Sequence, residues 1–210
     1  GAGQVVILSW WLTTPFAATI ARVALKGNFP CGRISKYGDG QAPWLPGKEF
    51  DGWNMLCESF SKSSTLTDLD LSDCYLGPQA LTPLAKAISS MATSMATLNS
   101  IALDGCAITG TTFGTGYEEN QGGRYEKIEK LDADLSGFNS FCLALKSSQI
   151  ITLRLQKCYL GPEALAMLAD AIKFMATLTE LGVRLNEALD EAALAELRAA
   201  APETCKILTD

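Results

Sequence analysis

The chain has 210 residues, with 17 basic and 23 acidic side chains and no histidine, and its formal net charge is −6 at pH 7. Without histidine, Ser-His-Asp triads and Cys-His pairs are impossible and the commonest general base near neutral pH is missing, so we expect that the protein is not an enzyme. Residues 1–50 carry a net charge of +3 and residues 51–210 a net charge of −9. The acidic main part argues against nucleic-acid binding, which requires a basic stripe.

Residues 1–27 form an apolar segment. From Val5 to Leu25 there are 21 residues with no acidic side chain and a single basic one, Arg22. This length is sufficient for a helix to cross about 30 Å of hydrocarbon, so the sequence predicts a single transmembrane anchor. The predicted anchor side chains are Val5, Leu8, Trp10, Trp11, Phe16, Ile20 and Leu25. Two alternatives stay open, an uncleaved signal-like segment and an apolar helix buried against another protein.

Basic residues lie on the C-terminal side of the predicted anchor. They are Arg22, Lys26, Arg33 and Lys36. The positive-inside rule then predicts that the rest of the chain lies on the cytoplasmic or stromal side, where these bases can meet anionic lipid headgroups. Residues 28–50 are rich in glycine and proline and predict an extended linker between the anchor and a second domain, residues 51–210.

The second domain contains a repeated phrase. Cys74–Leu81 reads Cys-Tyr-Leu-Gly-Pro-Gln-Ala-Leu, and the phrase returns 84 residues later, at Cys158–Leu165, with Glu in place of Gln. This distance is three periods of 28 residues, a spacing typical of solenoids built from strand-and-helix units. The shared frame is L-x-x-L-x-L-x-x-C/N-x-L. It begins at Leu66, Leu98, Ile150 and Leu178.

Each frame predicts a short strand followed by a helix. Pro78 and Pro162 stand where helices begin, because proline is favoured in the first helical turn. Residues 109–130 have many glycines and no apolar period, so they predict an irregular insert that replaces the helix of the second frame. Residues 131–145 predict one degenerate repeat, and residues 189–208 predict a last helix with a terminal cap.

At the frame residues the chain resembles the leucine-rich repeats of the ribonuclease-inhibitor type. This resemblance implies an α/β solenoid, a short curved horseshoe with parallel strands inside and helices outside, here preceded by the membrane-type N-terminal helix. It implies protein binding but no particular partner. The phrase Leu69-Asp70-Leu71-Ser72-Asp73-Cys74, followed after Tyr75 by Leu-Gly-Pro, is also similar to repeat proteins of dinoflagellate-type photosynthetic protists. That second resemblance implies a photosynthetic membrane complex in the chloroplast thylakoid.

The strand residues that alternate with the leucines would line the concave face of such a solenoid. The predicted partner-binding residues are Asp68, Asp70, Asp73, Asp104, Arg154, Gln156, Lys157 and Arg184. This face runs from acidic to basic along the chain, so it could orient a partner. The alternative is that scattered strand charges only keep the sheet soluble.

Candidate metal and catalytic residues are few. Cys74, Cys106 and Cys158 share one frame position, but they lack the paired Cys-x-x-Cys spacing of zinc sites, so we expect reduced structural thiols, no metal and no cofactor. Two carboxylate pairs, Asp132 with Asp134 and Asp68 with Asp70, are candidates for catalysis, but surface solvation is the simpler explanation. The glycine-rich stretch 110–116 lacks the Gly-Lys-Ser/Thr of a phosphate-binding loop.

These features predict a non-catalytic protein-protein interaction module, tethered by one helix and serving as an accessory or scaffold subunit of a membrane complex. The second resemblance suggests a photosystem or light-harvesting assembly. Expected partners are other subunits and membrane lipid, with incidental pigment contacts at the anchor and no nucleic acid. One alternative is a soluble regulatory leucine-rich-repeat protein whose apolar N-terminal arm is buried in a partner. A more remote alternative is an enzyme with carboxylate or thiol chemistry.

Overall fold

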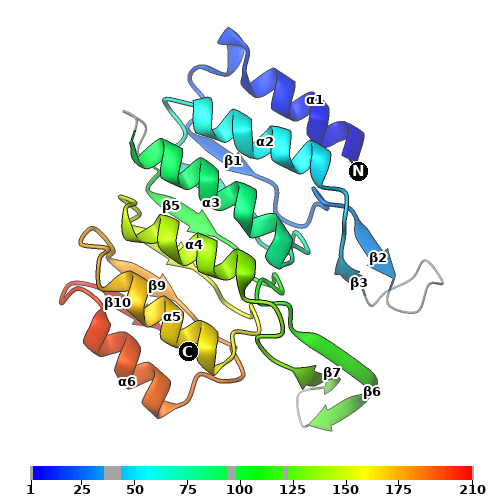
Figure 1. Cartoon of the computed structure of the whole chain (residues 1–210), viewed down its shortest axis with the longest axis vertical. Coiled ribbons are helices and arrows are strands. Elements are labelled where there is room, and N and C mark those ends of the chain that lie inside the picture. Colours follow the sequence, from blue (N-terminus) through cyan, green and yellow to red (C-terminus); the bar gives the residue numbers. More distant parts are fainter. Residues whose placement is uncertain (1, 36–43, 94–97, 121–122, 210) are drawn as a thin grey trace.

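The protein is described by a computed structural model that covers residues 2–35, 44–93, 98–120 and 123–209. Its fold is mixed α/β, with a six-stranded parallel sheet covered on one face by helices (Figure 1). The strands follow the order β1 (Arg22–Ala24), β4 (Asp68–Asp70), β5 (Ser100–Ala102), β8 (Thr152–Arg154), β9 (Glu180–Gly182) and β10 (Lys206–Leu208). Parallel pairing is possible because a helix carries the chain back between successive strands of this sheet.

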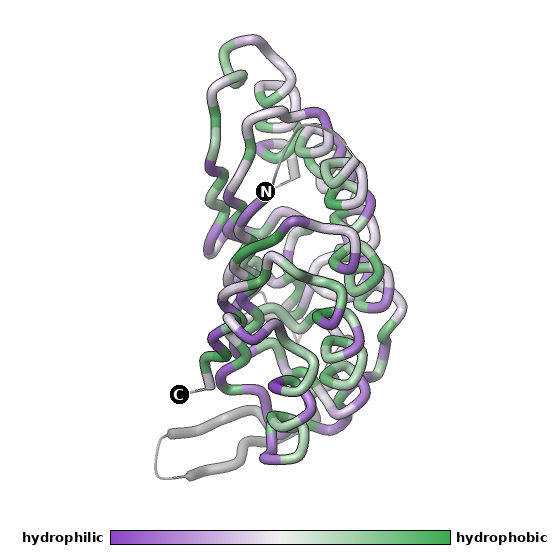
Figure 2. The backbone as a smooth tube through the Cα atoms, turned by 90° about the vertical axis from the view of Figure 1, so that its left-hand side faces the viewer, coloured by the Kyte–Doolittle hydropathy of each residue, from purple (hydrophilic) through white to green (hydrophobic). Residues whose placement is uncertain are grey.

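The helices in the described ranges are stacked in sequence order. They are α1 (Ala2–Leu12), α2 (Phe50–Lys62), α3 (Pro78–Ala92), α4 (Ser136–Lys146), α5 (Pro162–Ile172) and α6 (Glu191–Ala200), with a short 3-10 helix, η1 (Pro15–Ala17), after α1. Figure 1 shows them side by side from α1 at the top to α6 at the bottom. The view at right angles shows the sheet along one side of the molecule and the helices along the other (Figure 2). The chain is therefore a stack of helix-and-strand units.

The apolar frame positions form rows through the stack. Leu69, Ile101, Leu153 and Leu181 are register partners on successive strands, and each is 2% exposed or less. Because parallel strands hold equivalent residues at the same height, one frame position repeated in sequence becomes one continuous row. On the helical side, the Trp53 indole donates a hydrogen bond of 2.8 Å to the Ala80 carbonyl, which ties α2 to α3.

The cysteine position of the frame forms a ladder of hydrogen bonds between units. The donor and acceptor distances are Cys74 Sγ to Leu25 O, 3.0 Å; Cys106 Sγ to Leu71 O, 3.4 Å; Cys158 Sγ to Leu103 O, 3.2 Å; and Asn186 Nδ2 to Leu155 O, 2.9 Å. Every acceptor is the second leucine of the L-x-L core in the unit before, directly after the strand. These thiols are free and buried, so the prediction of a structural cysteine column is confirmed.

The N-terminal segment does not form the predicted membrane-type helix. α1 ends at Leu12 after 11 residues, η1 begins at Pro15, and β1 follows at Arg22. An α-helix of this size extends about 16 Å, roughly half the thickness of a hydrocarbon core. Across the described residues, no helix combines the length and apolar character needed to cross a membrane. The membrane-type helix of the expected fold and the single-pass membrane localisation are therefore wrong.

Residues 20–28 are instead a further copy of the repeat frame. Ile20, Val23, Leu25 and Asn28 hold the spacing of the later frames, and Val23 is the register partner of Leu69. The Asn28 side chain donates to the Leu25 carbonyl three residues earlier, at 3.1 Å, as the equivalent Asn186 does to Val183, at 2.8 Å. The long apolar run around this frame hid its alternation, which is why hydropathy suggested a membrane helix.

Two antiparallel hairpins interrupt the stack, each between a strand and the following helix. β2 (Arg33–Ser35) pairs with β3 (Trp44–Pro46) in the segment predicted as a linker, whose residues 36–43 lie outside the described ranges. β6 (Thr112–Asn120) pairs with β7 (Gly123–Lys130) in the segment predicted as an irregular insert. Both hairpins leave the stack on the same side (Figure 1).

The helix of the second frame is not replaced by the insert. α4 follows β7 and takes the place of that helix, packing between α3 and α5. Since β5 pairs directly with β8, residues 131–145 supply this helix and no separate repeat. The prediction of a loop followed by a degenerate repeat is therefore wrong at both points.

Candidate binding surfaces

The concave face of the sheet is built from strand residues that alternate with the buried rows. On β4, Asp68 and Asp70 are half-buried on either side of buried Leu69. On β8, Thr152 and Arg154 flank Leu153 in the same way. The alternation of strand side chains thus places the predicted binding residues of these strands on one face, as expected from the sequence.

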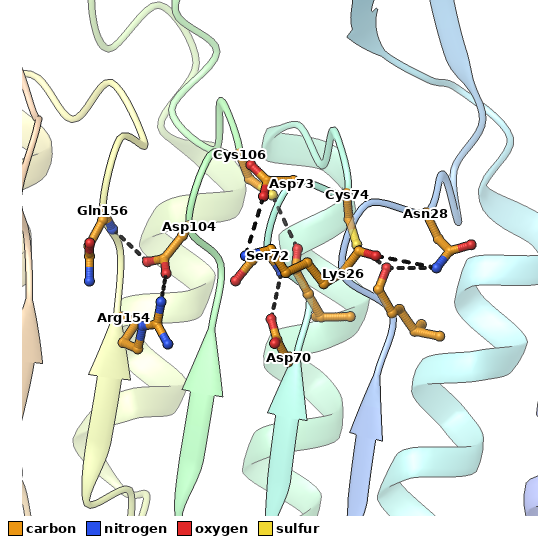
Figure 3. Close-up of polar contacts among 12 residues, drawn as sticks. Lys26, Asn28, Asp70, Ser72, Asp73, Cys74, Asp104, Cys106, Arg154 and Gln156 are labelled. Carbon is orange, nitrogen blue, oxygen red and sulfur yellow. Dashed lines mark hydrogen bonds and ion pairs between the residues drawn. The ribbon is translucent and has the colours of Figure 1, made fainter.

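Arg154 is used inside the molecule. Its guanidinium donates to the Asp104 carboxylate of the neighbouring unit, and the second carboxylate oxygen of Asp104 accepts the Gln156 backbone N–H at 2.9 Å (Figure 3). The Asp104 side chain is 15% exposed and that of Arg154 is 42% exposed. Three of the predicted partner-binding residues are therefore joined in an internal network that links β5 to β8.

The acidic end of the concave face also has internal partners. Asp70 accepts the Ser72 N–H at 3.1 Å, and Asp68 accepts the Thr67 hydroxyl at 2.6 Å. Asp73 lies 3.8 Å from the Lys26 ammonium, and Arg22 is the register partner of Asp68. Lys26 and Arg22 belong to the N-terminal unit, which the sequence predicts to be a membrane anchor. The concave face therefore begins with a basic strand, β1, ahead of the acidic and basic parts that the sequence predicts.

Lys157 and Arg184 complete the predicted set. Lys157 is exposed at a left-handed turn position, with φ of 53°, and its N–H donates to the Arg184 carbonyl at 2.8 Å. The Nε atoms of Arg184 and Arg154 are buried without a hydrogen-bond partner. The same turn position is left-handed at Gly27, Asp73, Gly105 and Leu185. The turns of these five units are thus equivalent, although the sequence puts different residues there.

The candidate catalytic carboxylates have structural roles. Asp132 accepts the N–H groups of Gly161 and Ala164 at 2.9 and 3.0 Å, and so caps the first turn of α5. Asp134 accepts the N–H and the hydroxyl of Ser136 at the start of α4. Two neighbouring aspartates therefore bind the starts of two different helices, which explains the pair without chemistry.

The thiols are poor candidates for nucleophiles. Burial raises the pKa of the Cys31, Cys74 and Cys142 thiols to about 12 and that of Cys106 to about 11. These thiols stay protonated near neutral pH, whereas the thiolate is the reactive form. Within the described ranges, no group of three or more His, Cys, Asp and Glu side chains is placed to hold a metal ion.

The N-terminal unit carries five exposed large apolar side chains in a short segment. We call this surface the α1 face. It consists of Val6 (36% exposed), Ile7 (67%), Trp10 (66%), Trp11 (37%) and Phe16 (84%). The opposite side of the same segment belongs to the core, because Val5 is buried and Leu8, Leu12, Ile20 and Leu25 pack against the core cluster. Of the seven predicted anchor residues, four lie in or against the core, and three are exposed on the α1 face. The core residues are Val5, Leu8, Ile20 and Leu25, and the exposed ones are Trp10, Trp11 and Phe16.

Two hollows lie beside these elements. A groove of about 640 Å³ runs between α2 and α3 and is lined by Phe50, Asn54, Thr82, Pro83 and Lys86 among others. A smaller hollow of about 360 Å³ lies next to α1, between Val5 and Leu8 on the helix and Leu25, Phe29 and Pro30 after β1. The first groove also has polar side chains in its lining, among them Glu58 and Gln79, whereas the lining of the second is mainly apolar.

No protein-family model and no curated protein matches the chain. Among solved structures, it is similar to the leiomodin-1 actin-binding site 2, with 9% sequence identity and a TM-score of 0.50 over 95% of this chain and 86% of that one. At this identity the likeness shows the fold alone. It agrees with a stack of helix-and-strand units and leaves function to be argued from the surfaces described above.

Proposed function

We propose that this chain is a non-catalytic repeat module that binds another protein through the α1 face. The repeat frame and the helix in every unit support a leucine-rich repeat of the ribonuclease-inhibitor type, a scaffold suited to protein binding. We do not propose a membrane-tethered subunit, because no helix among the described residues is long and apolar enough to span a bilayer. The alternative, an apolar N-terminal arm buried in a partner, is the reading that fits the N-terminal unit.

The exposed apolar side of α1 carries this proposal. A helix that is apolar around its whole circumference is a buried helix, and an apolar helix of 10 to 14 residues belongs in a protein core more often than across a membrane. α1 is such a helix, with 11 residues and no charged side chain, yet Ile7 and Trp10 on its outer side are about two-thirds exposed. Tryptophan is also enriched among the residues that dominate binding energy at protein interfaces. A partner that covers the α1 face would complete the burial.

The first prediction tests the α1 face directly. In purification of the tagged full chain from its native source, Trp10→Asp should remove a stoichiometric protein partner that the wild type retains, with affinity at least ~30-fold weaker. The matched control is Leu143→Asp, since Leu143 is a 57% exposed apolar residue on the middle helix α4. Because both side chains face solvent, both variants should keep the thermal midpoint of the wild type within a few degrees.

The two variants decide the proposal together with a measurement of mass in solution. Loss of the partner with Trp10→Asp and its retention with Leu143→Asp is the expected result. If the two variants retain the partner equally, the α1 face is not the binding surface. If the purified chain is a dimer that Trp10→Asp converts to a monomer, the partner is a second copy, and the proposed binding of another protein fails.

A further inference from the structure

We infer that the N-terminal end of the stack accepts a helix-and-strand unit of the partner, whose helix packs on the α1 face and whose acidic strand pairs with the free edge of β1. This inference rests on the proposed function, because it specifies the partner of the α1 face. It adds a second contact surface, the edge of β1, and a charge pattern for the partner.

The two ends of the stack differ in chemistry. At the C-terminal end, α6 exposes the charged residues Glu191, Glu196 and Arg198. Repeat stacks need such a polar outer face on a terminal unit to remain soluble. At the N-terminal end, α1 has no charged residue and exposes the α1 face instead. The exposed side of the N-terminal unit is therefore apolar, whereas α6 carries exposed charges.

The strand of the N-terminal unit has one free edge. β1 is at the end of the sheet and, within the described ranges, pairs with β4 alone. The N–H groups of Leu25 and Gly27 donate to the carbonyls of Asp70 and Ser72 at 2.8 and 2.9 Å, and the Ala21 carbonyl accepts from Asp68 at 3.0 Å. Since successive residues of a strand direct their backbone groups to opposite edges, the N–H groups of Arg22, Ala24 and Lys26 face away from β4. This edge and the α1 face belong to the same unit.

The charge on β1 indicates what kind of strand fits there. Its concave row is Arg22, Ala24 and Lys26, and on the occupied edge this row meets acids: Asp68 is the register partner of Arg22, and Asp73 lies 3.8 Å from Lys26. Opposite charges on adjacent strands stabilise pairing, and like charges oppose it. A second strand with aspartate or glutamate at alternate positions would match the free edge as β4 matches the occupied one.

The same charges argue against a second copy as the occupant. If two β1 strands paired antiparallel about Ala24, Arg22 of each chain would face Lys26 of the other. Two such pairs of like charges oppose the contact. The edge and its charges thus favour a different protein, with an acidic strand and an apolar helix in the relative positions that β4 and α2 hold in this chain.

The experiment uses the full chain, labelled with ¹⁵N, and a synthetic peptide of residues 50–73, which contains α2 and β4, as the probe. We expect saturable binding, with at least ~10-fold slower hydrogen exchange at the amides of Arg22, Ala24 and Lys26 and little change at Val23 and Leu25, which already face β4. A peptide with Asp68, Asp70 and Asp73 replaced by lysine should bind at least ~10-fold more weakly.

Two variants of the chain isolate the edge. Ala24→Pro removes an outward N–H on an edge strand, a position where proline is tolerated, and should abolish protection of the β1 amides. Ala24→Thr keeps the N–H and should bind as the wild type does. Binding that leaves the three amides unprotected, or equal binding of the lysine peptide, overturns the inference. Protection of these amides in the chain alone with a dimeric mass, or only with vesicles of phosphatidylcholine and phosphatidylglycerol, overturns it in favour of a second copy or a lipid surface.

The two proposals fail separately. If Trp10→Asp removes the native partner but the peptide does not protect β1, binding through the α1 face stands and only the strand pairing falls. If Trp10→Asp leaves the native partner bound, the proposed function itself is wrong.

Discussion

At the scale of single residues, the frame position shared by Cys74, Cys106, Cys158 and Asn186 shows how far residue type can vary within one structural role. Each side chain donates to the unit before, yet asparagine does more. Asn186 Nδ2 donates to Leu155 and Val183 at 2.9 and 2.8 Å, while its Oδ1 accepts the N–H groups of Cys158 and Leu160, both at 3.0 Å. The Cys106 sulfur meets the equivalent N–H groups of Cys74 and Leu76, but sulfur is a weaker acceptor than an amide oxygen, so equivalent positions differ in energetic weight.

This difference gives a prediction for stability. Asn186→Ala leaves two buried N–H groups without an acceptor and should lower the free energy of unfolding by about 3 kcal/mol or more. Cys158→Ala removes one weak S–H donor and a sulfur-sized volume, so it should cost about 1–2 kcal/mol. Urea denaturation under reducing conditions measures both. A larger effect of Cys158→Ala would mean that the ladder is held by packing of the thiols and not by hydrogen bonds.

At the scale of elements, the hairpin β6–β7 is an addition to the stack and not part of it. Thr112 and Lys130 are register partners at its base, so the chain enters and leaves at one place. The Asp134 N–H donates to the Thr109 carbonyl at 3.0 Å below that base. At the base of the hairpin, the Phe113 ring packs edge-on against the Tyr159 ring of the stack, at 5.1 Å between centroids. The hydrogen bond between Asp134 and Thr109 thus joins the segment after β5 to the segment before α4 without help from the hairpin.

We therefore expect the fold to survive removal of the hairpin. Replacing residues 113–129 by Asn-Gly, a two-residue connection suited to adjacent antiparallel ends, should preserve the circular dichroism spectrum. The lost Phe113–Tyr159 contact should lower the free energy of unfolding by about 1 kcal/mol. Phe113→Ala in the intact hairpin is the matched control and should cost a similar amount. A deletion variant that does not fold would show that the hairpin is required to form the second frame.

The elements also show what sequence alone could predict. Four frames with buried leucines and a cysteine ladder follow from a period of 28, because each unit repeats the same packing problem. β1 is not predicted, because Ile20, Val23 and Leu25 lie within a long apolar run. In such a run the same residues fit both a membrane helix and a buried strand. The hairpin is not predicted, because many glycines in one segment indicate irregular structure. Strands tolerate glycine at bulges, and the ladder of this hairpin shifts register between Phe113 and Tyr117.

At the scale of the whole molecule, the charges that the concave face offers to a partner depend on which of its side chains already pair within the chain. The predicted binding residues were found by alternation alone, and alternation cannot show that Arg154 bonds to Asp104 or that Lys26 lies beside Asp73. These partners come from strands far apart in sequence, brought together by the order of the sheet. The α1 face was within the predicted anchor, but its division into core and surface sides required the position of α2, against which α1 packs.

The six buried thiols make the whole fold sensitive to alkaline pH. Burial raises the pKa of these thiols in the folded state above the ordinary value of 9.0. Above that value the unfolded chain releases protons that the folded chain keeps, so the free energy of unfolding is maximal below about pH 9 and falls as pH rises. Each thiol contributes about 1.4 kcal/mol per pH unit, or about 8 kcal/mol for six.

Since a domain of this kind is stable by about 5–15 kcal/mol, the protein should unfold between about pH 10 and pH 11. Urea denaturation in reducing buffer at pH 8, 9 and 10 measures the slope. Cys142→Ala removes one buried thiol and should reduce the fall by about 1.4 kcal/mol per pH unit, whereas Cys205→Ala, at a half-buried position, should reduce it less. A free energy of unfolding that stays constant from pH 9 to pH 10 would mean that the thiols ionise in the folded state, and hence that solvent reaches the ladder between the units.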